Sequence, residues 1–201
     1  MATEATRVDP TEHHTSTGLA NAKMAMWAFL GSECLFFGSM ISTYLLYRNA
    51  TAAGPTSAEL YDIPYTSVSS FVLLMSSLTM VLALEAVQKN DRRAMRIWLL
   101  ATAFLGLTFI GGQVFEFTTF VEEGLTLRTS AFGSAFFVLT GFHGAHVTVG
   151  ILMLLGLFAM SAFGRLGPED SRPVELIGLY WHFVDIVWIV IFTVVYLIPS
   201  N

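Results

Sequence analysis

Five long apolar segments dominate the sequence, and short polar stretches separate them. The segments span residues 22–48, 66–88, 96–121, 131–163 and 174–198. Each is long enough to cross a bilayer, which takes about 20 apolar residues in a helix. Because backbone polar groups in lipid must be hydrogen-bonded within the segment, each is expected to be an α-helix. The sequence therefore predicts an all-α, polytopic membrane protein with five transmembrane helices in a bundle (residues 22–198), preceded by a polar N-terminal tail (residues 1–21).

The composition supports a membrane protein and excludes several other classes. Hydrophobic residues make up 54% of the 201 residues and charged residues only 12%, whereas soluble domains have about 25% charged residues. The net charge of −5 offers no basic surface for a nucleic acid. The single cysteine, Cys34, cannot form a disulfide within the chain. The chain is therefore neither an ordinary soluble globule, nor a nucleic-acid binder, nor a disulfide scaffold.

The Lys and Arg residues predict the orientation in the membrane, because they concentrate in cytoplasmic loops. With five spans, Arg48 and Arg128 fall on one side of the membrane. The other side holds the remaining eight of the ten basic residues, namely Arg7, Lys23, Lys89, Arg92, Arg93, Arg96, Arg165 and Arg172. This bias places the N-terminus in the cytoplasm and the C-terminus outside.

Five ionisable side chains are expected at membrane depth, where each charge costs at least about 2.5–3.5 kcal/mol on insertion scales. Glu33 lies about 16 Å along the first span, close to the midplane. His143 and His146 share one face of the fourth span, and His182 and Asp185 share one face of the fifth, because three-residue spacing places side chains together. The five are predicted to share one polar layer between the midplane and the cytoplasmic side.

Further residues on the third and fourth spans are of secondary interest. Gln113 and Glu116 form another polar pair at three-residue spacing. Glu116 and Glu85 lie nearer span ends, so both are expected to reach interfacial water. A stripe of small residues, opposite the imidazoles of the fourth span, is predicted to let a neighbouring helix approach closely. It consists of Gly141, Gly144, Ala145 and Thr148.

The residue types alone leave four interpretations of the polar layer open. It can be a hydrogen-bonded network that fixes helix packing. It can be a metal or haem site of a free-standing membrane protein, because two His pairs with carboxylates nearby supply ligands. It can be a proton path, because Glu and His chains are its usual components. It can also serve a non-catalytic subunit that packs on a larger membrane enzyme.

Four sequence stretches resemble subunit III of haem–copper respiratory oxidases. FGSAFFVLTGFHGAHVTVG (132–150) resembles the signature helix of that family, and WHFVDIVWIVIFTVVYL (181–197) resembles its last helix. GSECLFFG (31–38) is similar to the family's segment with a membrane-embedded Glu, and QVFEF (113–117) to its Gln-x-x-Glu segment. The stretches occur in family order, and the resemblance covers residues 22–198.

The resemblance implies a five-helix bacterial form of the subunit, in the inner membrane, without catalytic residues, metal or haem of its own. Such a subunit packs on oxidase subunit I and near subunit II, which carry the haem and copper, binds phospholipid, and supports proton uptake and stability during turnover. Cytochrome c is the expected electron donor, reached through other subunits; a quinol oxidase is the alternative.

The resemblance also matches individual residues of this chain to positions of the family. Glu33 matches the family's buried carboxylate, and its intramembrane polar cluster is matched by His143, His146, His182 and Asp185. Longer members have two further N-terminal helices with a lipid cleft beside them. This chain resembles their last five helices, so that cleft is expected to be absent here or to be walled by helices of another subunit.

The charge bias makes the orientation testable. A topology reporter fused after Asn201 should report the outside, and one inserted in the 88–96 turn should report the cytoplasm, because positive loops stay inside. Activity of both reporters on the same side of the membrane would contradict the five-span arrangement.

Overall fold

The structure is a computed structural model that describes residues 21–50, 61–166 and 171–198. The described residues form five long helices: α1 (Asn21–Tyr47), α3 (Ile63–Gln88), α4 (Arg92–Glu122), α5 (Ala131–Ala162) and α6 (Ser171–Phe192), which continues into the π-helical turn η1 (Thr193–Leu197). All five are long and apolar enough to cross a membrane. The all-α, five-span prediction is therefore confirmed. Of the predicted polar tail, residues 1–20 lie outside the described residues.

Polar caps explain why two helices start three or four residues before the predicted apolar segments. The side chain of Asp62 accepts a hydrogen bond from the Tyr65 N–H at 3.1 Å, and that of Asp91 accepts one from the Ala94 N–H at 2.9 Å. Such caps pair N–H groups that the first turn leaves without partners. Helices α3 and α4 therefore begin at their caps and not at the first apolar residue.

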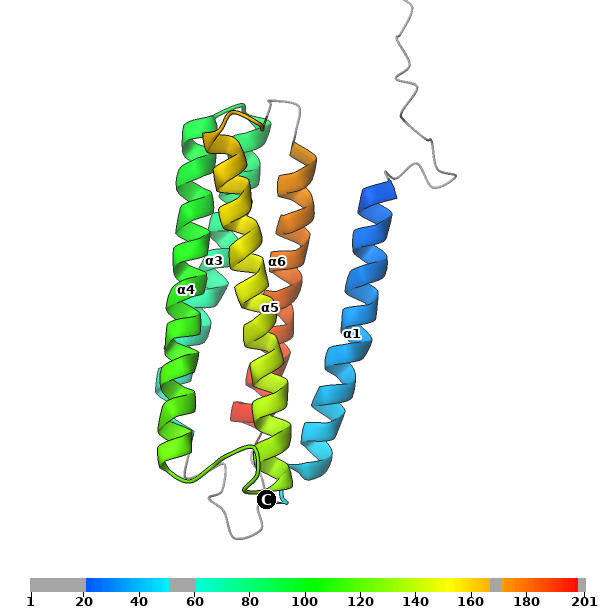
Figure 1. The fold of residues 1–201 in the computed structure, drawn as a ribbon, viewed down its shortest axis with the longest axis vertical. Helices are drawn as coiled ribbons and strands as arrows, with labels where there is room; N and C mark the ends of the chain where they lie inside the picture. The colour runs from blue at the N-terminus through cyan, green and yellow to red at the C-terminus, as the bar shows by residue number, and fades with distance from the viewer. Residues whose placement is uncertain (1–20, 51–60, 167–170, 199–201) are drawn as a thin grey trace, which may run out of the picture.

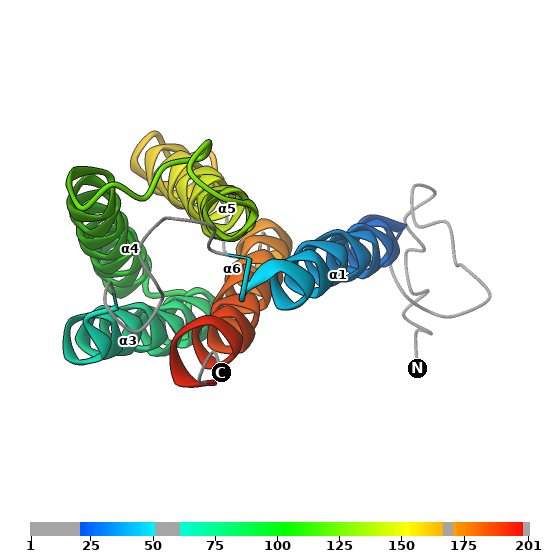
Figure 2. The ribbon, with the colours of Figure 1, turned by 90° about the horizontal axis from the view of Figure 1, so that it is seen from below.

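Helices α3, α4, α5 and α6 form a four-helix bundle in which consecutive helices run antiparallel (Figure 1). Helix α1 stands outside this bundle and packs against α5 and α6 (Figure 2). The described chain begins at one end of the bundle and finishes at the other. This arrangement agrees with an odd number of membrane crossings.

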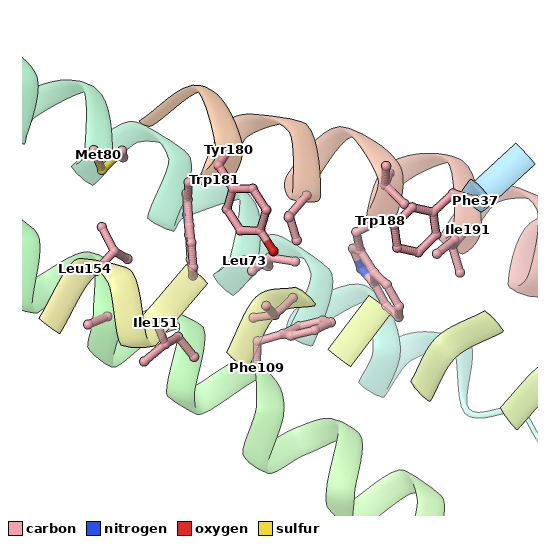
Figure 3. Close-up of a cluster of buried hydrophobic side chains, with 14 of the residues drawn as sticks. Phe37, Leu73, Met80, Phe109, Ile151, Leu154, Tyr180, Trp181, Trp188 and Ile191 are labelled. Carbon is pink, nitrogen blue, oxygen red and sulfur yellow. The ribbon is translucent and has the colours of Figure 1, made fainter. Parts of the chain in front are cut away.

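Two tryptophans of α6 fill the centre of the bundle (Figure 3). The Trp181 indole N–H donates to the Ser76 hydroxyl of α3 at 2.9 Å, and the Trp188 N–H donates to Ser70 at 2.8 Å. The Trp181 ring packs so closely against Gly150 of α5 that an added Cβ there would lie 2.8 Å from ring carbons. Each indole is therefore hydrogen-bonded at its polar edge and enclosed by neighbouring helices at its apolar faces.

Helix α1 contacts the bundle through a narrow seam. Its buried residues are Leu30, Phe37 and Tyr44, at seven-residue spacing. This repeat keeps one line of side chains facing a neighbouring helix, as in coiled coils. Most other α1 side chains remain exposed, including Leu35 at 78%. The outer face of α1 is thus free for lipid or for another subunit.

The packing around Trp181 predicts opposite outcomes for two glycines of α5. Gly150→Ala should lower the free energy of unfolding by about 1–3 kcal/mol, because its methyl group overlaps the indole ring. Gly141→Ala is the matched control, since a Cβ at Gly141 meets nothing within 4 Å, and should be neutral or stabilising. Denaturant unfolding in detergent measures both, and equal stability of the two variants would contradict this packing.

Candidate functional site

Glu33 of α1 and His146 of α5 form a polar pair between the outer helix and the bundle. The Glu33 Oε2 and His146 Nε2 atoms lie 3.2 Å apart, and both side chains are largely buried. The Phe37 ring packs edge-on against the His146 ring at a centroid distance of 4.9 Å, with Phe36 nearby at 6.2 Å. The pair is therefore the polar contact inside an otherwise apolar α1–α5 seam.

The hydrogen bonds of His146 determine how many protons the pair holds. Its Nδ1 lies 2.8 Å from the Phe142 carbonyl, which can only accept, so Nδ1 carries a hydrogen. The Glu33–Nε2 contact then holds one proton, either on the carboxyl group or on an imidazolium. We predict a neutral Glu33 that donates to a neutral imidazole, because a charge at membrane depth is costly.

His143 lies deeper in the bundle and has a different partner. Its Nε2 lies 3.2 Å from the Val184 carbonyl of α6, to which it donates, while its Nδ1 has no hydrogen-bond partner. The ring is completely buried. It packs against the rings of Trp188 and Phe109 at 4.8 and 5.9 Å. This environment suits a neutral imidazole that links α5 to α6.

His182 and Asp185 lie at the contact between α6 and α3. The His182 Nδ1 is 2.6 Å from the Ser77 hydroxyl of α3. Asp185 is only 3% exposed, and neither carboxyl oxygen has a hydrogen-bond partner among the described residues. Of the five residues predicted to share one layer, Glu33 and His146 are hydrogen-bonded to each other, and the other three make no hydrogen bond to either in the described part of the chain.

Gln113 and Glu116 of α4 are both buried, at 7% and 8% exposure. Gln113 donates to the Thr140 carbonyl of α5 at 2.8 Å, and Glu116 accepts from the Thr66 hydroxyl of α3 at 2.8 Å. The expectation that Glu116 reaches interfacial water is therefore wrong, because the start of α3 and the aromatic end of α6 cover it. Glu85 is exposed and pairs with Lys89 instead.

A cluster of three tyrosines beside Glu116 is missed by the sequence reasoning. The hydroxyl groups of Tyr44 and Tyr61 lie 3.4 Å apart, and the Tyr61 ring packs on the Tyr196 ring at 4.6 Å. Burial raises the pKa of Tyr61, which precedes α3, well above its usual range. Tyr196 lies in the π-helical turn η1 and contacts Glu116. In the sequence these tyrosines lie near span ends. Aromatic residues are common there as interface anchors, so their position alone does not indicate a buried cluster.

The small-residue stripe of α5 does not pack as a unit within this chain. Gly144 is buried so close to Gln113 that an added Cβ would lie 2.5 Å from its Oε1. Gly141, in contrast, has open space around its Cα hydrogens, and Ala145 and Thr148 are exposed. Helix α5 approaches α4 closely at Gly144 and α6 closely at Gly150. The other three residues of the stripe do not face the bundle.

The described residues contain no group of three or more His, Cys, Asp or Glu side chains placed to hold a metal ion. Glu33 and His146 form a two-residue contact, and the partner of His182 is a serine. A structural metal site usually needs four ligands, and a catalytic one three. The arrangement therefore suits hydrogen bonds between helices.

The state of Glu33 can be tested by infrared spectroscopy of the purified protein. We expect a protonated-carboxyl band at pH 7 that disappears in Glu33→Gln, because the neutral pair keeps the proton on the carboxyl group. Glu85→Gln is the matched control and should leave that band unchanged, since Glu85 is exposed and paired with Lys89. A carboxylate band assigned to Glu33 at pH 7 would refute this prediction.

Comparison with known proteins places these features in a family. The family model for cytochrome c oxidase subunit III matches residues 1–200. The quinol oxidase subunit 3 of Bacillus spizizenii is 39% identical over 188 residues, covering 94% of this chain and 92% of that protein. The cytochrome c oxidase subunit 3 of Bacillus sp. (strain PS3) is 41% identical over 177 residues, covering 88% and 86%.

A third relative comes from a different bacterial group. The cytochrome bo(3) ubiquinol oxidase subunit 3 of Pseudomonas aeruginosa is 38% identical over 187 residues, covering 93% of this chain and 88% of that protein. Relatives of both oxidase types thus match nearly the whole five-helix chain. Together with the membrane-spanning helices, these matches show that the chain is a multi-pass bacterial membrane protein that belongs to the cytochrome c oxidase subunit III family.

Proposed function

We propose that this chain is the non-catalytic subunit III of a proton-pumping cytochrome c oxidase in aerobic respiration. In this role it packs on subunit I, near subunit II, and supports proton uptake and the stability of the complex during turnover. The haem and copper belong to those partner subunits. Electrons from cytochrome c reach them without passing through this chain.

The observation that carries this proposal is the pairing of the intramembrane polar side chains across helices. Glu33 meets His146, His182 meets Ser77, and Gln113 meets a backbone carbonyl. These contacts occupy groups, such as both nitrogens of His146, that a cofactor would otherwise need as ligands. They favour a subunit whose contribution is a rigid helix bundle with a large apolar surface.

The apolar surface supports contacts with lipid as well as with subunits. A groove of about 370 Å³ lies between α1 and α5, lined by Ser39, Met40, Thr43, Tyr47, Ala131, Ser134, Ala135 and Val138. Its lining is mainly apolar and carries no charged side chain, which suits a lipid acyl chain. We therefore propose this groove as a phospholipid contact.

The Glu33–His146 pair supports a role in proton uptake, because its contact holds one proton within the membrane.

Glu33→Gln keeps the shape and a donor, so we expect the subunit to stay in the complex. Glu33→Ala leaves the His146 nitrogen unpaired, at a cost of about 1–3 kcal/mol, so retention of the subunit should fall. The protein composition of the purified complex measures both effects, and loss of the subunit in both variants alike would contradict them.

A quinol oxidase is the second candidate, and relatives of that name match this chain as well as the cytochrome c oxidase relatives do. The electron donor is determined outside this chain. Purified complex supplied with reduced cytochrome c or with a quinol decides between them, and oxidation of cytochrome c supports the first proposal. A two-copper Cys/His site in subunit II of the same complex would agree with that result.

The supporting role predicts a particular time course of oxygen consumption. Complex purified without this chain should begin at a rate close to that of the intact complex and then lose activity sooner during sustained turnover. Initial turnover should also survive Glu33→Gln, because oxygen is reduced elsewhere. Complete loss of initial turnover in a fully assembled Glu33→Gln complex would contradict a non-catalytic role.

A further inference from the structure

His182 has one hydrogen-bonding nitrogen in use and one free. Its Nδ1 contacts the Ser77 hydroxyl of α3 at 2.6 Å. Its Nε2 has no hydrogen bond to any described residue, and it is not among the buried polar atoms without a partner, so it reaches the surface. His182 lies eleven residues after Ser171, or about 16 Å along the 27-residue span. The free nitrogen is therefore near the middle of the bilayer.

The Ser77 hydroxyl determines which hydrogen His182 presents at that surface. Among the described residues its hydrogen-bond partner is His182 Nδ1, and neither Asp185 oxygen is hydrogen-bonded to it. If the Ser77 O–H points to Nδ1, this hydroxyl hydrogen has its acceptor.

The opposite direction is less favourable. If His182 donated to Ser77, the Ser77 O–H would be left without an acceptor among the described residues, and an unpaired donor away from water is costly. The favoured direction leaves Nδ1 as an acceptor, so the hydrogen of the neutral imidazole is on Nε2. His182 thus presents an N–H donor outward at mid-membrane depth.

The surface around this donor is apolar. Val81 follows Ser77 by one turn of α3, while Ile186 and Ile189 follow His182 by one and two turns of α6. Their side chains are 49%, 60% and 44% exposed. Acyl chains would cover the apolar residues but cannot accept a hydrogen bond, and an unsatisfied N–H in hydrocarbon costs several kcal/mol. The surface therefore fits a protein helix that carries an acceptor.

We propose that the α3–α6 face around His182 docks against a transmembrane helix of a partner oxidase subunit that accepts a hydrogen bond from His182 Nε2–H. The acceptor is a carbonyl, hydroxyl or carboxyl oxygen at mid-membrane depth. A second copy of this chain fits poorly, because a symmetric contact would place one donor against another. Helix α1 packs on α5 and α6 and leaves this face uncovered (Figure 2). The inference rests on the proposed function and specifies its contact surface.

Photo-cross-linking in the assembled complex tests which molecule covers this face. A benzophenone amino acid replaces Ile186, and the matched control carries it at Phe104 of α4, which is 69% exposed. We expect position 186 to cross-link to another oxidase subunit and position 104 to give lipid adducts. Reaction of position 186 with lipid alone, or with a second copy of this chain, would overturn the inference.

Failure of the proposed function and failure of the assigned contact face give different results. If the chain does not co-purify with an oxidase, the proposed function fails. If it co-purifies but cross-links to its partner through position 104 and not through position 186, the function stands and the assignment of the α3–α6 face is wrong.

Variants of His182 test the hydrogen bond itself. His182→Phe should weaken retention of the subunit in detergent about three- to tenfold, in line with single interhelical hydrogen bonds in membranes. His182→Gln, which keeps an N–H donor, should stay near the unsubstituted protein. Ser77→Ala removes the hydrogen bond within the chain but leaves Nε2 in place, so it should reduce retention of the subunit less than His182→Phe does. Equal reductions of retention in Ser77→Ala and His182→Phe, or no reduction in His182→Phe, would overturn the inference.

Discussion

Trp181 holds the bundle together through one hydrogen bond and two close contacts. Its indole N–H is bonded to Ser76 of α3, and its ring fills the space that Gly106 of α4 and Gly150 of α5 leave free. One side chain of α6 therefore contacts each of the other bundle helices. Because these contacts set the distance between α5 and α6, they also shape the surface on which α1 packs. The Glu33–His146 pair depends on that surface.

The bilayer explains why so many polar side chains occur inside this bundle and why they occur in pairs. Lipid offers no hydrogen-bond partner, so a donor in one helix must find an acceptor in another. Ser70 with Trp188, Thr66 with Glu116, and Gln113 with a carbonyl of α5 follow this rule. Asp185, the Nδ1 atom of His143 and the free nitrogen of His182 depart from it. A subunit that works within a larger complex can leave such groups for its partners.

The sequence predicts the five helices well, because the length of an apolar run determines whether it spans a bilayer. It also identifies Glu33 and His146 as polar residues at depth, but their pairing across 113 positions requires the tertiary structure. Helical spacing defines faces within one helix and not the neighbour that each face meets. For that reason the predicted small-residue stripe fails beyond Gly144, and the burial of Glu116 is missed. The orientation, and the functional roles of the polar residues, stay predictions.

The central claim is that this chain supports an oxidase and contributes no ligand to its redox centres. Haem and copper analysis of the complex, purified with and without the chain, tests that claim most directly. The account predicts the same haem and copper content per copy of subunit I in both preparations, because the proposed partner subunits hold the redox centres. Loss of one equivalent of haem or copper together with the chain would contradict it.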